Sequence, residues 1–186
     1  TIVATGADEL KPLDLYMYGE DKRVKTLLEL DEILEKDSDK IKNCNTAVFI
    51  QCVGSRNDER LYCSRVCCSH SVMNALKLKE MKAEMDVYIL YRDMRTYGFR
   101  EDYYREASDR GVMFIRYEPE DPPDINTVED KGRSFLRITA TEPILGRRLE
   151  IEADLVCLAT ASVPPAGNKT LSRILKVPLN EDGFFM

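Results

Sequence analysis

Four of the six cysteines lie within one short segment, and their spacing points to metal or redox chemistry. Cys52, Cys63, Cys67 and Cys68 follow the pattern C-x10-C-x3-C-C. A chain of 186 residues buries enough apolar surface to fold without disulfides. In a reducing compartment, clustered thiols more often bind metal or carry out redox chemistry than form structural disulfides. We therefore interpret this segment as a candidate metal or redox site.

The cysteine segment lies between a predicted strand and a predicted helix. Residues 46–55 form a continuous apolar run that is typical of a central parallel strand, and residues 64–81 have apolar side chains at helical spacing. Cys67 and Cys68 are adjacent and would point roughly 100° apart in a regular helix. Since both are candidate ligands of one metal group, we expect an irregular first turn at the junction of loop and helix.

Strands and helices alternate along the rest of the chain. The apolar patterns predict a helix over 27–40 through Leu28, Leu30, Ile33 and Leu34, strands over 2–4, 86–93, 112–117 and 153–161, a helix over 100–111 and a hairpin or meander over 135–153. Strand, helix, strand, helix, strand in this order implies right-handed parallel crossovers. The predicted fold class is α/β, a Rossmann-like three-layer domain with a parallel sheet and an antiparallel β-meander.

The turn after residues 46–55 lacks the glycine-rich phosphate loop of a dinucleotide-binding unit. Gly54 is its only glycine, so dinucleotide binding at this turn is disfavoured. Four thiolates near a helix N-terminus suit an anionic iron-sulfur cluster, because the helix dipole and the free N–H groups stabilise negative charge there. Arg56, Arg60 and Arg65 would offset the remaining charge. Zinc is the alternative metal, although structural zinc sites use closely spaced cysteine pairs.

Other residue types that could do chemistry have simpler interpretations. His70, the only histidine, is expected to cap or pack the helix rather than to bind metal, and Val72, Met73 and Leu76 are expected on the apolar face of that helix. The remaining cysteines are expected to pack in the core: Cys44 and Cys157. The arginines that follow the strand over 86–93 are expected to face solvent or a partner: Arg92, Arg95 and Arg100. The nearby aromatic side chains are expected to pack between helix and sheet, with a partner surface or an apolar shell around the cluster as the alternative: Tyr97, Phe99, Tyr103 and Tyr104.

Composition excludes several classes of function. Hydrophobic residues make up 44% and charged residues 32%, as in an ordinary globular protein, and the net charge of −6 argues against non-specific nucleic-acid binding. No apolar run approaches the ~20 residues of a membrane helix, and no signal peptide is recognisable. We expect a cytoplasmic protein with no membrane span. Because the chain begins without Met, in an apolar stretch, it resembles a piece of a larger protein.

The cysteine segment and its surroundings resemble one known family. "FIQCVGSRNDERLYCSRVCCSH", "YRDMRTYGFRE", "ADLVCLATASVPPAGN" and "VPLNEDGFFM" are similar to the A-type subunit of the heterodisulfide reductases, over nearly all 186 positions. The resemblance implies an oxidoreductase subunit with a thioredoxin-reductase-like core, one FAD and iron-sulfur clusters. The implied partners are other heterodisulfide-reductase-type subunits, or a hydrogenase or dehydrogenase that donates electrons.

The resemblance also assigns residues. It implies that Cys52, Cys63, Cys67 and Cys68 hold a [4Fe-4S] cluster by a non-standard pattern. This chain resembles the half of the flavoprotein core that is similar to an NAD(P)H domain. The implied division is 1–45 as the edge of the FAD domain with a connecting helix, 46–160 as the Rossmann-like domain with the cysteine loop, and 161–186 as the return toward the FAD domain.

The implied flavin contacts lie at two strand ends. Thr5 and Gly6 are expected near the flavin, together with Thr160. Ala161 stands where the family pattern has glycine. If that glycine lets the backbone approach the flavin closely, the Cβ of Ala161 would interfere with this contact. Since the G-x-G-x-x-G that would hold the FAD pyrophosphate is not in this chain, we expect weak or no FAD binding and no activity by the chain alone. The implied function is electron relay between the cluster and FAD or partner subunits. An NAD(P)H-dependent flavoprotein reductase and a zinc-stabilised interaction module are the alternatives.

Overall fold

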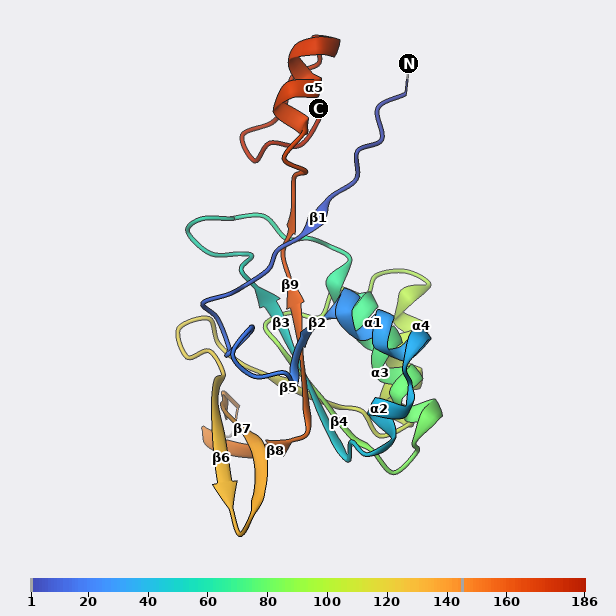
Figure 1. Ribbon diagram of the computed structural model, residues 1–186, viewed down its shortest axis with the longest axis vertical. Helices are drawn as coiled ribbons and strands as arrows, with labels where there is room; N and C mark the ends of the chain where they lie inside the picture. The colour runs from blue at the N-terminus through green and yellow to red at the C-terminus, as the bar shows by residue number, and fades with distance from the viewer. Residues whose placement is uncertain (1, 145) are drawn as a thin grey trace.

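A parallel sheet forms the centre of the molecule (Figure 1). The computed structural model describes residues 2–144 and 146–186. Every neighbouring pair of strands in this sheet is parallel, as expected when crossover connections return the chain to the same end of the sheet. Its strands lie in the order β2 (Val24–Thr26), β9 (Leu155–Thr160), β3 (Thr46–Val53), β4 (Asp86–Tyr91) and β5 (Met113–Arg116).

Helices cover one face of this sheet, and an antiparallel sheet covers the other. The helical layer consists of α1 (Leu27–Lys36), α2 (Asp39–Lys42), α3 (Cys67–Met81) and α4 (Arg100–Asp109). The second sheet is the meander β6 (Asp124–Asp130), β7 (Arg133–Glu142) and β8 (Arg147–Ala153). The predicted α/β three-layer fold, with a parallel sheet and an antiparallel meander, is therefore confirmed.

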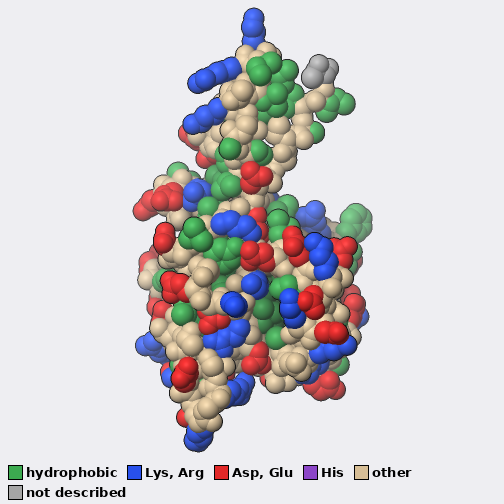
Figure 2. Space-filling model, viewed as in Figure 1, with side chains coloured by type: hydrophobic (Ala, Val, Ile, Leu, Met, Phe, Trp, Pro, Cys, Tyr) green, Lys and Arg blue, Asp and Glu red, His purple; other side chains and the backbone are tan. Residues whose placement is uncertain are grey.

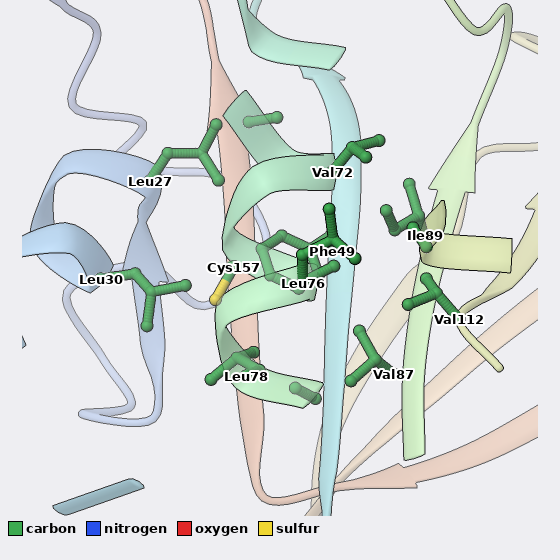
Figure 3. Packing of buried hydrophobic residues seen from close by; sticks show 14 of the residues in the cluster. Leu27, Leu30, Phe49, Val72, Leu76, Leu78, Val87, Ile89, Val112 and Cys157 are labelled. Carbon is green, nitrogen blue, oxygen red and sulfur yellow. The ribbon is translucent and has the colours of Figure 1, made fainter. Parts of the chain in front are cut away.

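Two apolar cores hold the three layers together. Between the parallel sheet and the helices, Phe49 of β3 lies in one buried cluster with Val72 and Leu76 of α3 (Figure 3). On the opposite face, Val48 of β3 shares a second buried cluster with Ile138 of β7. Successive side chains of a strand point to opposite faces, so β3 is buried on both sides. The strand that leads into the cysteine segment is thus enclosed between two layers.

The helix predicted over 27–40 is shorter in the structure because its ends carry capping residues. Thr26 and Glu29 form a capping box, in which the Thr26 hydroxyl accepts from the Glu29 N–H and the Glu29 carboxylate accepts from the Thr26 N–H. The helix ends at Lys36, before Asp37, whose backbone is no longer helical. Its buried side is formed by Leu27 and Leu30, which turns Leu28 toward solvent. The expectation that Leu28 belongs to the apolar face is therefore wrong.

Three further details differ from the sequence expectations. Residues 2–4 are not a strand, because no neighbouring strand pairs with them and Ile2 is exposed. The polar segment Asp124–Asp130 is a strand, since β7 supplies its hydrogen-bond partners. Met73, expected on the apolar face of α3, is half-exposed. Pairing and packing by distant parts of the chain decided each of these outcomes.

The packing continues across residue 45. β2 pairs with β9, and Leu27 and Leu30 lie in the same core as β3, so residues 24–42 pack with residues 46–160. The segments at the two ends leave the body together, since β1 (Asp8–Glu9) pairs with β10 (Ser162–Val163) before α5 (Asn168–Leu175). The assignment of residues 1–45 and 161–186 to a flavin-binding half stays a prediction.

The surface carries charges of both signs. Figure 2 shows Lys and Arg side chains interspersed with Asp and Glu over the body, and hydrophobic side chains on the protruding segment. Ile174 and Met186 of that segment are exposed. Among the helices of the described residues, none is long and apolar enough to cross a membrane.

Candidate metal centre

The cysteine segment begins where the central strand ends. β3 is irregular at Cys52, which has a left-handed φ of 62°, and the pairing with β9 shifts register around this residue. Cys67 and Cys68 are the first two residues of α3, at the junction of loop and helix. Cys63 lies in the loop between them. The irregular backbone expected in the first helical turn lies instead just before it, at Arg65 with φ of 65°.

Hydrogen bonds to the C-terminal part of the chain fix the loop over residues 54–66. The Tyr62 hydroxyl donates to the Ser162 carbonyl at 2.8 Å, and the Ser162 N–H donates to the Ser64 hydroxyl at 2.9 Å. The Tyr62 ring also packs edge-on against Phe184, with ring centroids 5.8 Å apart. The loop that carries Cys63 is therefore held against residues that follow the central sheet.

Electrostatic interactions connect all four thiols. A hydrogen bond with Cys68 and burial raise the pKa of the Cys67 thiol, and the charges of Cys68, Cys52 and Cys63 act in the same direction. Three of the four side chains are buried, and Cys63 is half-buried. The structure thus brings the four predicted ligands into one neighbourhood.

Positive charge lies on one side of this thiol group. The Cys67 hydrogen bond lowers the pKa of the Cys68 thiol to about 7, assisted by the Arg95 N–H and by the charges of Arg95 and Arg56. Burial raises the pKa of the Cys52 thiol, and a hydrogen bond from Arg56 opposes that effect. These surroundings therefore favour the thiolate, which is the form that binds metal, at Cys68.

Of the arginines after β4, which were expected to face solvent or a partner, two do not simply face solvent, and the partner-facing alternative stays a prediction. Arg92 Nη1 donates to the Arg56 carbonyl at 2.9 Å, and Arg95 is half-buried with its Nη2 3.9 Å from Asp93 Oδ2. Arg100 is exposed, as predicted. The carboxyl end of β4 lies beside the carboxyl end of β3 in a parallel sheet, so these side chains meet the cysteine loop.

Sequence reasoning missed Asp93 as a residue of the site. Its carboxylate accepts from Arg56 Nη2 at 2.6 Å, and its carbonyl lies 3.8 Å from Cys68 Sγ. Asp93 is separated from Arg56 by 37 positions, so no local spacing reveals the contact. The usable signal was topological, since polar residues that directly follow neighbouring parallel strands meet at one edge of the sheet.

The residue types present fit an iron-sulfur group in their chemistry. Thiolate is the ligand type that such clusters use, and three buried polar side chains beside the cysteines or the strand end lack hydrogen-bond partners in the described part of the chain: Gln51, Ser69 and Thr160. No three His, Cys, Asp or Glu side chains among the described residues stand in a metal-binding arrangement. Metal binding at thiolate sites is coupled to local folding, so a preformed arrangement is not required. A bound group would draw the four cysteines of this neighbourhood together.

The candidate flavin contacts are not brought together. Gly6 is exposed and lines a crevice of about 710 Å³ together with Cys63, whereas Thr5 is exposed on the N-terminal segment. Thr160 is buried and lines a separate crevice of about 280 Å³ together with Cys67. Each crevice thus reaches a different cysteine of the candidate centre.

Ala161 has an ordinary backbone at the strand end, and its effect on a close approach to the flavin stays a prediction. Its φ is not positive, its N–H donates to the Val53 carbonyl at 2.9 Å, and its carbonyl accepts from the Leu10 N–H at 2.9 Å. Glycine is required only where φ is positive or a backbone approaches closely. Ala161 therefore fits the strand end without strain.

The remaining single residues have structural roles. His70 Nε2 lies within hydrogen-bonding distance, 2.6 Å, of Asp31 Oδ2. This contact joins α3 to α1, so His70 packs the helix layer, one of the two roles expected for it. Cys157 is fully buried and Cys44 is packed against the same core, which confirms the core interpretation of both.

The expectation that the aromatic group packs in the core is wrong for most of its members. Tyr97, Phe99 and Tyr103 are exposed by 74%, 93% and 45%. Only Tyr104 packs inward, with its ring centroid 4.5 Å from that of Phe114. The loop that follows β4 and the outer side of α4 carry the other three rings away from the sheet, so aromatic character alone did not place them.

Gly54 is the residue where the backbone leaves β3, and we predict that alanine there is destabilising. Its φ of 70° is left-handed, and an added Cβ would overlap the Leu10 side chain. We expect Gly54→Ala to lower the free energy of unfolding by about 1–3 kcal/mol, measured by urea denaturation. Gly98→Ala is the matched control, because Gly98 also has a left-handed φ of 63° but open space around its Cα. A loss no larger than that of Gly98→Ala would contradict the predicted overlap.

Solved structures define the class of this domain. The chain matches a thioredoxin reductase from T. acidophilum with a TM-score of 0.52 and 16% identity, over 97% of this chain and 49% of that one. It matches an NAD-dependent persulfide reductase from A. fulgidus with a TM-score of 0.51 and 19% identity, over 96% of this chain and 28% of that one. The fold is therefore that of a thioredoxin-reductase-like α/β domain.

Sequence comparison gives the family within that class. The chain is 37% identical over 200 residues to the A-type iron-sulfur subunit of the CoB-CoM heterodisulfide reductase from Methanocaldococcus jannaschii, covering 99% of this chain and 30% of that protein. It is 34% identical over 201 residues to the A-type subunit of the H2:CoB-CoM heterodisulfide,ferredoxin reductase from Methanothermobacter marburgensis, covering 100% of this chain and 29% of that protein. No protein-family model matches the sequence. The chain belongs to the family of heterodisulfide reductase A-type subunits and spans about 30% of the length of these relatives.

Proposed function

We propose that Cys52, Cys63, Cys67 and Cys68 bind a [4Fe-4S] cluster, and that the chain is an electron-relay segment of a heterodisulfide-reductase-A-type oxidoreductase. One observation carries the proposal: four thiols, none in a disulfide, lie in one neighbourhood, with Cys52 at the end of β3, Cys63 in the loop, and Cys67 and Cys68 at the start of α3. The relative from Methanocaldococcus jannaschii is named as an iron-sulfur subunit, which supports it. Six free thiols also fit a reducing compartment such as the cytoplasm.

The residues around the thiols are suited to an anionic group. A bound [4Fe-4S] cluster would supply one-electron transfer. Burial of Cys52, Cys67 and Cys68 excludes water from the thiolates, while the N–H groups at the start of α3 and the Arg56 guanidinium offset their charge. The N–H of Arg65 also donates to Cys63 Sγ at 3.3 Å.

We further propose that a flavin lies beside this centre in the complete protein. Two of the crevices that reach the cysteines are lined by predicted flavin contacts. Gly6 lines one, and the other is lined by Thr160, whose buried hydroxyl has no hydrogen-bond partner among the described residues. FAD is the flavin that the family resemblance implies, and Thr5 is a further backbone contact. The partners would be other subunits of a heterodisulfide-reductase-type complex, or a hydrogenase or dehydrogenase that donates electrons.

The alternatives are less well supported by the residues. A pyridine nucleotide would need a phosphate loop after β3, where the cysteine loop lies instead, and Arg92 is engaged with the Arg56 carbonyl. A zinc-stabilised interaction module would need the same thiols, and four thiolates do bind zinc. Metal analysis separates these possibilities.

Anaerobic reconstitution tests the proposal. The chain is incubated with iron and sulfide, desalted and analysed for metal, sulfide and the EPR signal of the reduced sample. We expect about four irons and four sulfides per chain and a signal that appears on reduction.

The same preparation is offered zinc and NADH in separate experiments. One zinc per chain with no uptake of iron would favour the interaction module, and tight NADH binding would favour a nucleotide-dependent reductase. Either result would contradict the electron-relay proposal for this chain.

A further inference from the structure

Arg56 contacts one of the candidate ligands directly. Its Nη1 lies 3.9 Å from Cys52 Sγ, within hydrogen-bonding distance for sulfur, and its Nη2 lies 2.6 Å from Asp93 Oδ2. The side chain is only 20% exposed. Arg56 therefore presents a fixed positive charge to the sulfur of Cys52 in a partly desolvated position.

The protein holds Arg56 in place at three points. Its backbone is left-handed, with φ of 56°, and its N–H donates to the Tyr62 carbonyl at 3.2 Å. Its carbonyl accepts from Arg92 Nη1 at 2.9 Å, and Asp93 holds the guanidinium. A left-handed backbone at a non-glycine residue is costly and persists only where surrounding contacts fix it. The placement of this one charge is thus built into the fold.

Asp93 connects this arrangement to a second candidate ligand. Its side chain holds Arg56 on Cys52, and its backbone carbonyl lies 3.8 Å from Cys68 Sγ. The charge on Arg56 is thus positioned relative to the ligands at both ends of the loop, Cys52 from β3 and Cys68 from α3.

We infer that Arg56, held by Asp93, is the residue that raises the reduction potential of the group bound by the four cysteines. This inference rests on the proposed function. Reduction adds one negative charge to the cluster, and a cation that donates a hydrogen bond to a ligand sulfur stabilises the more negative state. Arg56 does not bind the cluster itself. It acts through the sulfur of Cys52 and is therefore a positioning residue.

Arg60 provides a matched control in the same loop. Its side chain is 27% exposed, and its Nη1 donates to the Gly54 carbonyl at 3.4 Å and to Glu59 at 2.9 Å. Arg60→Gln removes the same charge from the loop without removing a donor to Cys52. The difference between Arg56→Gln and Arg60→Gln isolates the contact with sulfur from the general loss of charge.

The test is a redox titration of the reconstituted chain, followed by EPR, with iron content measured on the same samples. For Arg56→Gln we expect unchanged iron content and a roughly tenfold lower equilibrium constant for reduction, a midpoint about 59 mV more negative for one electron. Arg56→Lys should recover part of the shift, because it keeps the charge but loses the planar fork. Asp93→Asn should shift the midpoint in the same direction by less, and Arg60→Gln should shift it least.

Each result decides the inference. A wild-type midpoint in Arg56→Gln at full iron content overturns it, as does an equal shift in Arg60→Gln. If Arg56→Gln loses iron, the midpoint of Asp93→Asn decides instead, and a wild-type value overturns the inference. A wild-type chain that takes up no iron removes the proposed function as well, which is a different result from an unshifted midpoint.

Discussion

Serine at any one of Cys52, Cys63, Cys67 or Cys68 is expected to abolish the reconstituted cluster. The change replaces one sulfur by oxygen, and the serine hydroxyl is a poor ligand for iron that thiolates bind strongly. We expect the iron content to fall from about four per chain to below about one, together with loss of the EPR signal of the reduced sample. The variants should stay folded, because a Cys to Ser change alters one atom, and circular dichroism checks this.

Cys44→Ser is the matched control for this series. Cys44 is half-buried, lies outside the cysteine segment and has its Sγ 4.0 Å from the Lys40 carbonyl. Iron content equal to that of the unaltered chain is expected. If Cys44→Ser lost the cluster, or if one of the four loop variants kept all of it, the assignment of that cysteine would be wrong and the ligand set would need revision.

Phe49→Ala is expected to produce the largest loss of stability. Phe49 is fully buried in the middle of β3, between Ile89 of β4 and Cys157 of β9 in the sheet register. Figure 3 shows its ring near Leu76, beneath α3. Removing a buried phenyl ring leaves a cavity that a strand paired on both sides cannot collapse into, so the free energy of unfolding should fall by about 3–5 kcal/mol.

Phe99→Ala controls for the chemical change itself. Phe99 is 93% exposed, so the same truncation removes almost no buried surface. Its effect on stability should lie within about 0.5 kcal/mol of zero. Urea denaturation of both variants makes the comparison, and similar losses in the two would show that Phe49 is not the central packing residue of this core. Because β3 leads directly into Cys52, we also expect Phe49→Ala to weaken iron binding.

The order of elements around the site could be predicted from local pattern. The apolar run over 46–55 has the length and composition of a central strand, and helical spacing recurs after Cys67. These features depend on neighbouring residues only. The position of the cysteine segment between strand and helix, and with it the candidate chemistry, followed from the same local information.

Solvent exposure was predicted less well, because it depends on what lies opposite each side chain. Leu28 and Met73 belong to apolar stretches yet face solvent, since each helix buries only the side that meets the sheet. Phe99 and Tyr97 are aromatic yet exposed, because their loop leaves the helical layer. Conversely, Arg92 is charged yet engaged within the site.

The sequence by itself determined the types and spacing of the candidate ligands and the α/β character of the domain. Only the tertiary structure decided that β9 lies between β2 and β3, and that Asp93 holds Arg56 against Cys52. These contacts join residues far apart in the chain, and their formation depends on the order of strands in the sheet rather than on local propensity. For this reason the candidate donors were visible in the sequence, whereas the contact of Asp93 with Arg56 was not.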